Sequence, residues 1–233
     1  AKQATTLDQL SGGRLILGVG IGAYREEFEA WAPRVASTGK RGEMMDEGLA
    51  ALQSLLTDRV TNFSGKYYAY RDLEMFPKAK QTPLPLFIGG HNLAAVERAA
   101  RIGQGWLPGW RPWPELAERI TLLKDKTEQA GRPRDAVEVA PQFSVTLAKT
   151  PEEAERRYMA SGLVAHRKSL AYTGRDLTKQ VVANFVGSPD QMLEKVAALE
   201  AIGVDHACAL MIPADTIAEF EDQVEWFAET VIV

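Results

Sequence analysis

Short apolar runs that alternate with amphipathic helical segments constrain the fold of this chain more than any other feature. Residues 14–19 read RLILGV and residues 83–88 read PLPLFI, and glycines follow both runs. Short runs that are apolar on both faces are typical of strands in a parallel sheet that helices cover. The alternation of such strands with helices predicts an α/β fold with parallel strands.

The same pattern predicts the order of the elements. We expect five core strands, which begin near residues 14, 84, 105, 137 and 204. Expected helices span residues 4–10, 24–31, 41–56, 93–102, 116–130, 151–163, 188–201 and 216–231, and residues 62–73 form a hairpin-like excursion. Connecting loops differ greatly in length, which suits a barrel whose loops are elaborated for function. We therefore expect one barrel domain over residues 1–233, with an insertion near residues 158–186 that is either a lid or a solvated excursion.

Composition and charge exclude several classes of function. The net charge of −4 and the scattered basic residues argue against a nucleic-acid partner. No stretch approaches the roughly 18 apolar residues of a membrane span, and residues 1–10 do not read as a signal peptide, so we expect a cytoplasmic protein with no membrane partner. Cys208 is the single cysteine and the three histidines lack metal-pair spacing, so we expect no disulfide and no metal site.

Glycines cluster where the first strand ends. Residues 18–23 read GVGIGA, which satisfies the dinucleotide fingerprint G-x-G-x-x-[GA]. That fingerprint requires a second strand ending in an acidic residue about 20 residues later. Residues 40–56 read instead as a helix. The pattern therefore favours a strand end whose glycines leave it without side chains. It argues against a dinucleotide-binding fold.

Two such strand ends follow one another. Gly20 and Gly22 would let a flat, bulky group lie against the backbone. Gly89 and Gly90 come just before the next helix, where backbone N–H groups could hold a phosphate. The alternative is that these glycines only make tight turns.

Four segments, in order, carry a more specific pattern. They read KQATTLDQLSGGRLILGVGIGAYREEFEA at residues 2–30, FPKAKQTPLPLFIGGHNLAAVERAARIGQGWLP at 76–108, VGSPDQMLEKVAALEAIGVDHACALMI at 186–212 and EDQVEWFAETV at 221–231. Together they resemble the bacterial-luciferase-like flavin monooxygenase superfamily, which includes the coenzyme F420-dependent oxidoreductases. The resemblance covers essentially the whole chain. It implies a TIM (β/α)8 barrel that binds reduced FMN or F420 at the C-terminal ends of its strands.

The resemblance also assigns cofactor-binding residues. Gly20, Ile21 and Gly22 match the strand end beside the isoalloxazine or deazaflavin ring. The turn that binds the phosphate is matched by Gly89, Gly90, His91 and Asn92. A loop that closes over the phosphate side is matched by Gly109 and Trp110. Members commonly have an aspartate where this chain has Gln104, which is a departure from the family pattern.

Members usually begin with three further βα units, which agrees with an expectation of about five of eight strands here. Those units carry much of the substrate pocket and the usual acid and base, so no catalytic residue is assigned. We weigh three explanations: a longer polypeptide, a fragment, or two copies that complement each other's open edge.

Other candidate residues keep two readings each. His91 is either a phosphate contact or an exposed side chain, and His206 is expected to be structural. His166 lies in the polar insertion with Arg167, Lys168 and Arg175. Arg111 and Lys168 are candidates for contacting the polyglutamyl tail of F420. Three tryptophans could form a cofactor wall or pack as loop residues: Trp106, Trp110 and Trp113. An acidic cluster is expected to be the first turn of a helix: Glu26, Glu27 and Glu29.

Three functions follow. The first is a flavin- or F420-dependent oxidoreductase acting on a small organic substrate: a monooxygenase using reduced FMN and oxygen, or an F420 enzyme transferring hydride. The second is a non-catalytic, truncated paralogue that serves binding or assembly. The third is another barrel enzyme for a phosphorylated ligand. The resemblance favours the first, with a homodimer and a flavin reductase as expected partners.

Overall fold

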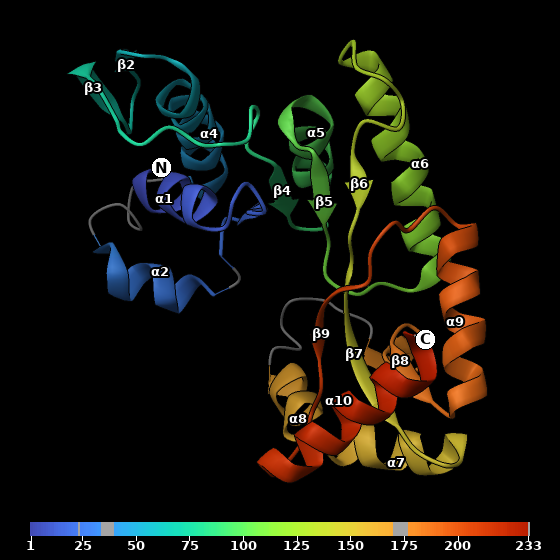
Figure 1. The fold of residues 1–233 in the computed structure, drawn as a ribbon. Coiled ribbons are helices and arrows are strands. Elements are labelled where there is room, and N and C mark those ends of the chain that lie inside the picture. The colour runs from blue at the N-terminus through green and yellow to red at the C-terminus, as the bar shows by residue number, and fades with distance from the viewer. Residues whose placement is uncertain (23, 34–39, 170–176, 233) are drawn as a thin grey trace. The chain divides into compact units, whose positions relative to one another are not determined.

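The computed structural model describes residues 1–22, 24–33, 40–169 and 177–232 (Figure 1). These residues form two compact units. The first contains residues 1–106 and 126–137, and the second contains residues 107–125 and 138–233. Each unit is built from parallel strands and helices, as the alternation in the sequence predicts. The expectation of one barrel domain over residues 1–233 stays a prediction.

The first unit holds the two glycine-rich strand ends. Its elements are α1 (Lys2–Leu10), β1 (Leu17–Val19), α2 (Arg25–Trp31), α4 (Arg41–Thr57), β2 (Thr61–Ser64), β3 (Ala69–Leu73), β4 (Leu86–Gly89) and α5 (Leu93–Ile102), and β5 (Gly105–Leu107) lies at its border. Strand β4 lies between β1 and β5. β1 and β4 are parallel, with Gly18 opposite Phe87, and β2 and β3 form the expected antiparallel hairpin.

An ion pair between a buried arginine and an exposed aspartate joins α4 to α5. Arg98 is only 5% exposed, and its guanidinium donates to both carboxylate oxygens of Asp46, at 2.7 and 2.9 Å. Arg101 adds a third bond to the same carboxylate at 3.1 Å. The hydrogen bond from Arg98 is the main cause of a lowered pKa for Asp46. This bidentate arrangement fixes the angle between the two helices that follow the glycine-rich strand ends.

A second carboxylate on α4 holds the hairpin. Glu47 accepts bonds from the backbone N–H groups of Lys66, Tyr67 and Tyr68, at 2.9, 2.6 and 2.7 Å. Burial raises the pKa of Glu47, but these three bonds outweigh it and leave the pKa below its usual value. The hairpin between α4 and β4 is therefore anchored to the helix that begins at Arg41.

The second unit is centred on one long strand. Its elements are α6 (Trp113–Gln129, its last turn in the first unit), β6 (Glu138–Val139), β7 (Gln142–Leu147), α7 (Pro151–Ala160), α8 (Gly162–Ser169), the 3₁₀ turn η2 (Leu177–Lys179), β8 (Phe185–Gly187), α9 (Pro189–Ala201), β9 (Cys208–Met211) and α10 (Ile217–Val231). β7 lies between β8 and β9 and is parallel to both. Phe143, Phe185 and Phe227 meet edge to face, with ring centroids 5.1 and 6.0 Å apart, and form the core behind β7.

Several expected boundaries were wrong. The strand expected from residue 14 begins at Leu17, because Arg14 belongs to the turn after α1: its backbone N–H donates to Ser11 Oγ at 3.2 Å. The strand expected to begin near residue 137 is two strands, β6 and β7, separated by Ala140 and Pro141. Proline has no N–H for the ladder, so it interrupts the strand.

One parallel strand was missed altogether. β8 consists of three residues, and all are buried. It pairs with β7, with Val145 opposite Phe185. In the sequence it follows a polar stretch that shows no period. The expected long helix over 151–163 also ends early, at Ala160, where Ser161 turns to an extended conformation and α8 begins.

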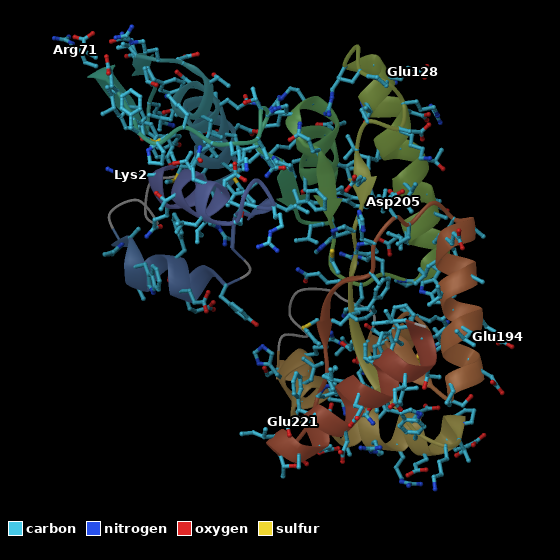
Figure 2. All side chains as sticks on the ribbon, viewed as in Figure 1. Lys2, Arg71, Glu128, Glu194, Asp205 and Glu221 are labelled. Atoms are coloured by element: carbon cyan, nitrogen blue, oxygen red, sulfur yellow. The ribbon has the colours of Figure 1, made fainter. Side chains whose placement is uncertain are left out.

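Charged side chains cover the surface of both units. Figure 2 labels six charged residues that are exposed: Lys2, Arg71, Glu128, Glu194, Asp205 and Glu221. Within the described residues, none of the helices has the length and apolar character needed to cross a bilayer.

Candidate functional site

The two glycine-rich strand ends lie side by side in the first unit. Because β1 and β4 are parallel, the residues after Val19 and Ile88 emerge at the same edge of the sheet. A Cβ atom added to Gly89 would lie 3.2 Å from the carbonyl oxygen of Val19 and 3.7 Å from Cα of Gly20. Only glycine therefore permits this close approach without a shift of the neighbouring backbone.

The backbone of the first strand end is open on one side. A Cβ atom added to Gly20 would meet no atom within 4 Å, and Gly20 is exposed. Gly22 has a φ of +78°, which favours glycine. This segment leaves room for a flat group to lie against the peptide planes of Gly20 and Ile21.

Arg41 fixes the far end of this segment. Its guanidinium donates to the carbonyl oxygens of Gly22 at 3.0 Å and Ile21 at 3.4 Å, and lies 6.0 Å from the ring centroid of Phe28. Sequence reasoning missed this residue. The available signal was an arginine at the first position of α4, where the helix dipole disfavours a cation unless acceptors compensate.

The second strand end turns sharply into α5. Gly90 has a φ of +121°, and a Cβ atom there would lie 3.0 Å from Cβ of Ala95. Asn92 caps the helix, since its side-chain oxygen accepts from the N–H of Ala95 at 2.8 Å. Asn92 therefore has a structural role at the N-terminus of α5 besides any contact with a ligand.

Trp106 on β5 holds the turn through a hydrogen bond to its backbone. Its side chain is 1% exposed, and its Nε1–H donates to the carbonyl oxygen of Gly90 at 2.8 Å. Gly89, Gly90, His91 and Asn92 thus form a rigid turn at a helix N-terminus, where exposed N–H groups and the helix dipole favour an anion. His91 is half-buried in this turn. The structure gives Trp106 a packing and hydrogen-bonding role beneath the turn.

A cavity of about 350 Å³ opens beside the first strand end. Gly20 and Ile21 line it together with side chains that are mostly apolar or aromatic and come from the first unit alone: Phe28, Met44, Met45, Leu49, Tyr68 and Tyr70. Arg41 is the charged side chain in this lining. The volume and apolar lining suit a small organic molecule.

Gly109 and Trp110 belong to the second unit, so their meeting with the strand-end glycines stays a prediction. Trp110 is 4% exposed, and the Arg167 guanidinium lies 5.4 Å from the centroid of its ring. Arg167 is itself buried and donates to Tyr158 Oη and, at 2.8 Å, to Ser144 Oγ. Part of the expected insertion is therefore packed against β7 through Arg167.

The remaining candidates divide into structural and exposed residues. His206 Nε2 lies 2.9 Å from Glu138 Oε2. Cys208 is half-buried, and that burial raises the pKa of its thiol. The Gln104 side-chain oxygen accepts a hydrogen bond from the N–H of Leu86 at 3.0 Å, so it ties β4 to the residue before β5.

The exposed side chains of His166 and Lys168, two candidates in the expected insertion, lie on α8. Arg175 lies outside the described residues.

Glu26 and Glu27 occupy the first turn of α2, as expected, and Glu29 follows them on the same helix. In the part of the chain that the structure describes, no three His, Cys, Asp or Glu side chains converge as a metal site would require. The residues present fit a phosphorylated cofactor with a flat ring. The open backbone at Gly20 and the turn at Gly90 are the two features that such a group requires.

Comparison with known proteins identifies proteins that are similar in sequence and in fold. The profile of the family described as luciferase-like monooxygenase matches residues 1–206. The FMNH2-dependent dimethylsulfone monooxygenase of Pseudomonas putida is 26% identical over 260 residues, which cover 100% of this chain and 69% of that protein.

Solved structures share the fold. The monooxygenase RslO1 of Streptomyces bottropensis matches with a TM-score of 0.79 at 21% identity, over 99% of this chain and 72% of that one. An F420-dependent secondary alcohol dehydrogenase, solved with an F420–acetone adduct, matches with a TM-score of 0.77 at 17% identity, over 99% and 73% of the two chains. At these identities the likeness establishes the α/β fold alone.

Proposed function

We propose, since this chain belongs to the family of luciferase-like monooxygenases, that it is an oxidoreductase that works with reduced FMN or coenzyme F420 on a small organic substrate. One observation carries the proposal. The bare backbone at Gly20 lies beside the rigid turn of Gly89 and Gly90, so one edge of the sheet offers a surface for a ring and a helix N-terminus for a phosphate.

Each residue of this edge has a distinct role in the proposal. The peptide planes of Gly20, Ile21 and Gly22 would support the ring, and Arg41 would hold that segment in place through two carbonyl oxygens. The N–H groups around Gly90 and His91 would bind the phosphate. Gly109 and Trp110 would cover the phosphate side.

The cofactor supplies the redox chemistry when bound, either oxygen transfer with reduced FMN and O₂ or hydride transfer with F420. The chain's contribution is to orient the ring and exclude water. We place the organic substrate in the apolar cavity beside Gly20, where Met44 and Met45 offer adaptable walls. A homodimer, a cytoplasmic location and, for the FMN case, a separate flavin reductase belong to the same proposal.

A graded substitution at Gly20 tests this site. Because a Cβ atom at Gly20 meets nothing within 4 Å, both Gly20→Ala and Gly20→Val should fold as the wild type does. The valine side chain would occupy the space given to the ring. We expect reduced FMN or F420, titrated anaerobically, to bind the wild type, to bind Gly20→Ala more weakly, and not to bind Gly20→Val measurably.

Equal binding of the cofactor to folded wild type and Gly20→Val would refute the placement of the ring. Binding of neither cofactor to the folded wild type would refute the cofactor assignment itself and favour a non-catalytic binding role. Circular dichroism spectra of the three proteins serve as the control for folding.

A further inference from the structure

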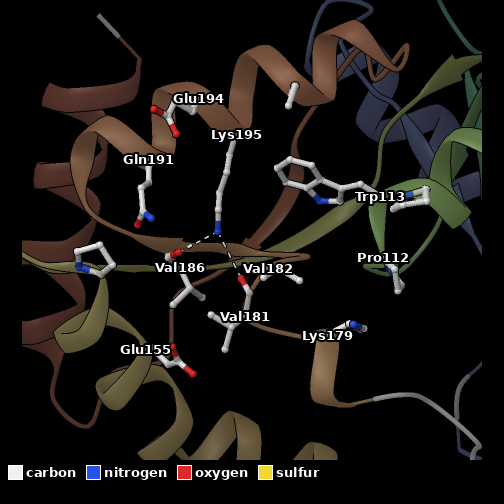
Figure 3. Close-up of a pocket in the computed structure, with 13 residues that line it drawn as sticks. Pro112, Trp113, Glu155, Lys179, Val181, Val182, Val186, Gln191, Glu194 and Lys195 are labelled. Atoms are coloured by element: carbon white, nitrogen blue, oxygen red, sulfur yellow. Dashed lines mark hydrogen bonds between the residues drawn. The ribbon is translucent and has the colours of Figure 1, made fainter.

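The second unit contains a cavity that the proposed function does not use. Its volume is about 760 Å³, within the range of ligand pockets. Residues from α6, α7, η2, β8 and α9 surround it (Figure 3). Apolar side chains form most of the wall: Pro112, Pro114, Pro151, Val181, Val182 and Val186.

The cavity wall includes a buried donor. The indole of Trp113 lines the cavity, and its Nε1–H has no hydrogen-bond partner among the described residues. A buried N–H without an acceptor is uncommon in folded proteins and costs free energy, so an acceptor from outside the chain is expected beside it. An acceptor atom on a bound molecule would satisfy it.

The same wall carries a half-buried cation. Lys195 on α9 donates from Nζ to the carbonyl oxygens of Asn184 at 2.6 Å, Val186 at 2.8 Å and Val181 at 3.3 Å. Within the described residues it forms no ion pair with a carboxylate. Burial lowers the pKa of Lys195 to about 8, because the three carbonyls supply hydrogen bonds but no negative charge.

Figure 3 shows the indole of Trp113 and the side chain of Lys195 reaching into the cavity from neighbouring helices. We propose that this cavity binds an apolar organic anion. Its apolar body would lie against the valines and prolines, its anionic head would accept from Trp113 Nε1–H, and the head would supply the countercharge that Lys195 lacks.

Other charged groups around the cavity are more exposed than Lys195. They are Glu155 of α7, Glu194 of α9 and Lys179 of η2, and all three side chains are exposed. Solvent screens charges of this kind, so they influence an anion inside the cavity less than Lys195 does. An apolar anion is therefore favoured over a neutral molecule of the same shape. The cavity lies within one unit, so this inference is independent of the cofactor proposal.

A matched pair of probes tests the inference. 2-Naphthoate and its neutral amide, 2-naphthamide, have the same ring and differ in charge. We expect calorimetric titration at pH 7 to show 2-naphthoate binding at least about tenfold more tightly, since a hydrogen bond to a charged group contributes about that much. Trp113→Phe keeps an aromatic ring in the wall and removes the donor together with the five-membered ring of the indole. The smaller ring affects both probes alike, so we expect the affinity for 2-naphthoate to fall by about tenfold more than the affinity for the amide.

The charge of Lys195 predicts a pH dependence. Binding of an anion favours the protonated amine, so the affinity for 2-naphthoate should fall as the pH rises from about 7 to about 9.5, whereas the affinity for 2-naphthamide should stay constant. Lys195→Met should abolish that pH dependence. If that variant unfolds because three carbonyls lose their donor, the Trp113→Phe titration still decides.

Equal affinities for the two probes, or an affinity for 2-naphthoate that neither Trp113→Phe nor pH changes, would overturn the inference. Absence of binding by 2-naphthoate at millimolar concentration would overturn it as well.

Discussion

Trp106 offers a precise perturbation of the turn at Gly90. Replacing it by phenylalanine keeps an aromatic ring in a site that is 1% exposed and removes the Nε1–H that donates to the Gly90 carbonyl at 2.8 Å. The substitution leaves the carbonyl with one partner fewer while the backbone of the turn stays chemically unchanged. Trp106→Phe therefore removes the hydrogen bond to the Gly90 carbonyl together with the five-membered ring of the indole.

Two losses set the magnitude. The lost hydrogen bond costs about 1 kcal/mol of the free energy of unfolding, and the smaller ring leaves buried space at a site that is 1% exposed, which costs about 1 to 2 kcal/mol more. For a chain of this length the melting temperature should drop by about 2 to 4 °C for each 1 kcal/mol lost. If the turn binds phosphate, we expect the hydrogen-bond part, about 1 kcal/mol, to appear as a loss of about fivefold in the affinity for phosphate.

The ratio of two affinities separates phosphate binding from general weakening. FMN carries a phosphate and riboflavin does not, so wild type should bind FMN more tightly, and Trp106→Phe should reduce the FMN-to-riboflavin ratio by about fivefold. Trp113→Phe is the matched control, since it makes the same change of ring, its Nε1–H has no acceptor in the part of the chain that the structure describes, and it lies in the other unit. An unchanged ratio in folded Trp106→Phe, measured by flavin fluorescence quenching, would refute the role given to Trp106.

Further predictions concern the backbone and two charged groups. Gly90→Ala should cost about 1 to 3 kcal/mol of stability because of its positive φ and the 3.0 Å contact, whereas Gly162→Ala, which meets nothing, should be neutral or slightly stabilising in urea unfolding. Asp46→Asn should cost about 2 kcal/mol at pH 7 because it leaves Arg98 buried without a full countercharge, and the difference from wild type should shrink as the pH falls through the lowered pKa of Asp46. The pKa of Lys195 is lowered, so the unfolded chain binds its proton more tightly and wild-type stability should gain up to about 3 kcal/mol from this group between about pH 8 and 10.5, a gain that denaturant titrations of Lys195→Met should lack.

The part of the fold that sequence reasoning predicted rests on strong periodicity. α5 has its observed bounds because alanines and a valine recur at helical spacing after a capping asparagine. The adjacency of Gly20 and Gly89 also follows from sequence, because consecutive parallel strands end at one edge of a sheet. β8 could not be predicted, since three residues after a polar stretch show no period and its burial depends on β7.

The contacts that position the candidate site were harder to predict from the sequence. Arg41 reaches the carbonyls of Ile21 and Gly22 across about twenty residues of sequence, and Trp106 reaches Gly90 across sixteen. Both depend on tertiary packing, which no local pattern encodes. Asn92 shows the reverse case: the sequence suggested a ligand contact, and the structure shows its side-chain oxygen already used in a helix cap.

The central claim is that a phosphorylated redox cofactor binds at the edge formed by Gly20 and Gly90. A crystal structure of the chain with reduced FMN or F420, whichever binds more tightly, tests it most directly. We predict a ring against the peptide planes of Gly20 and Ile21 and a phosphate at the N-terminus of α5. A cofactor bound elsewhere, with the backbone of Gly20 and the turn at Gly90 untouched, would contradict the account.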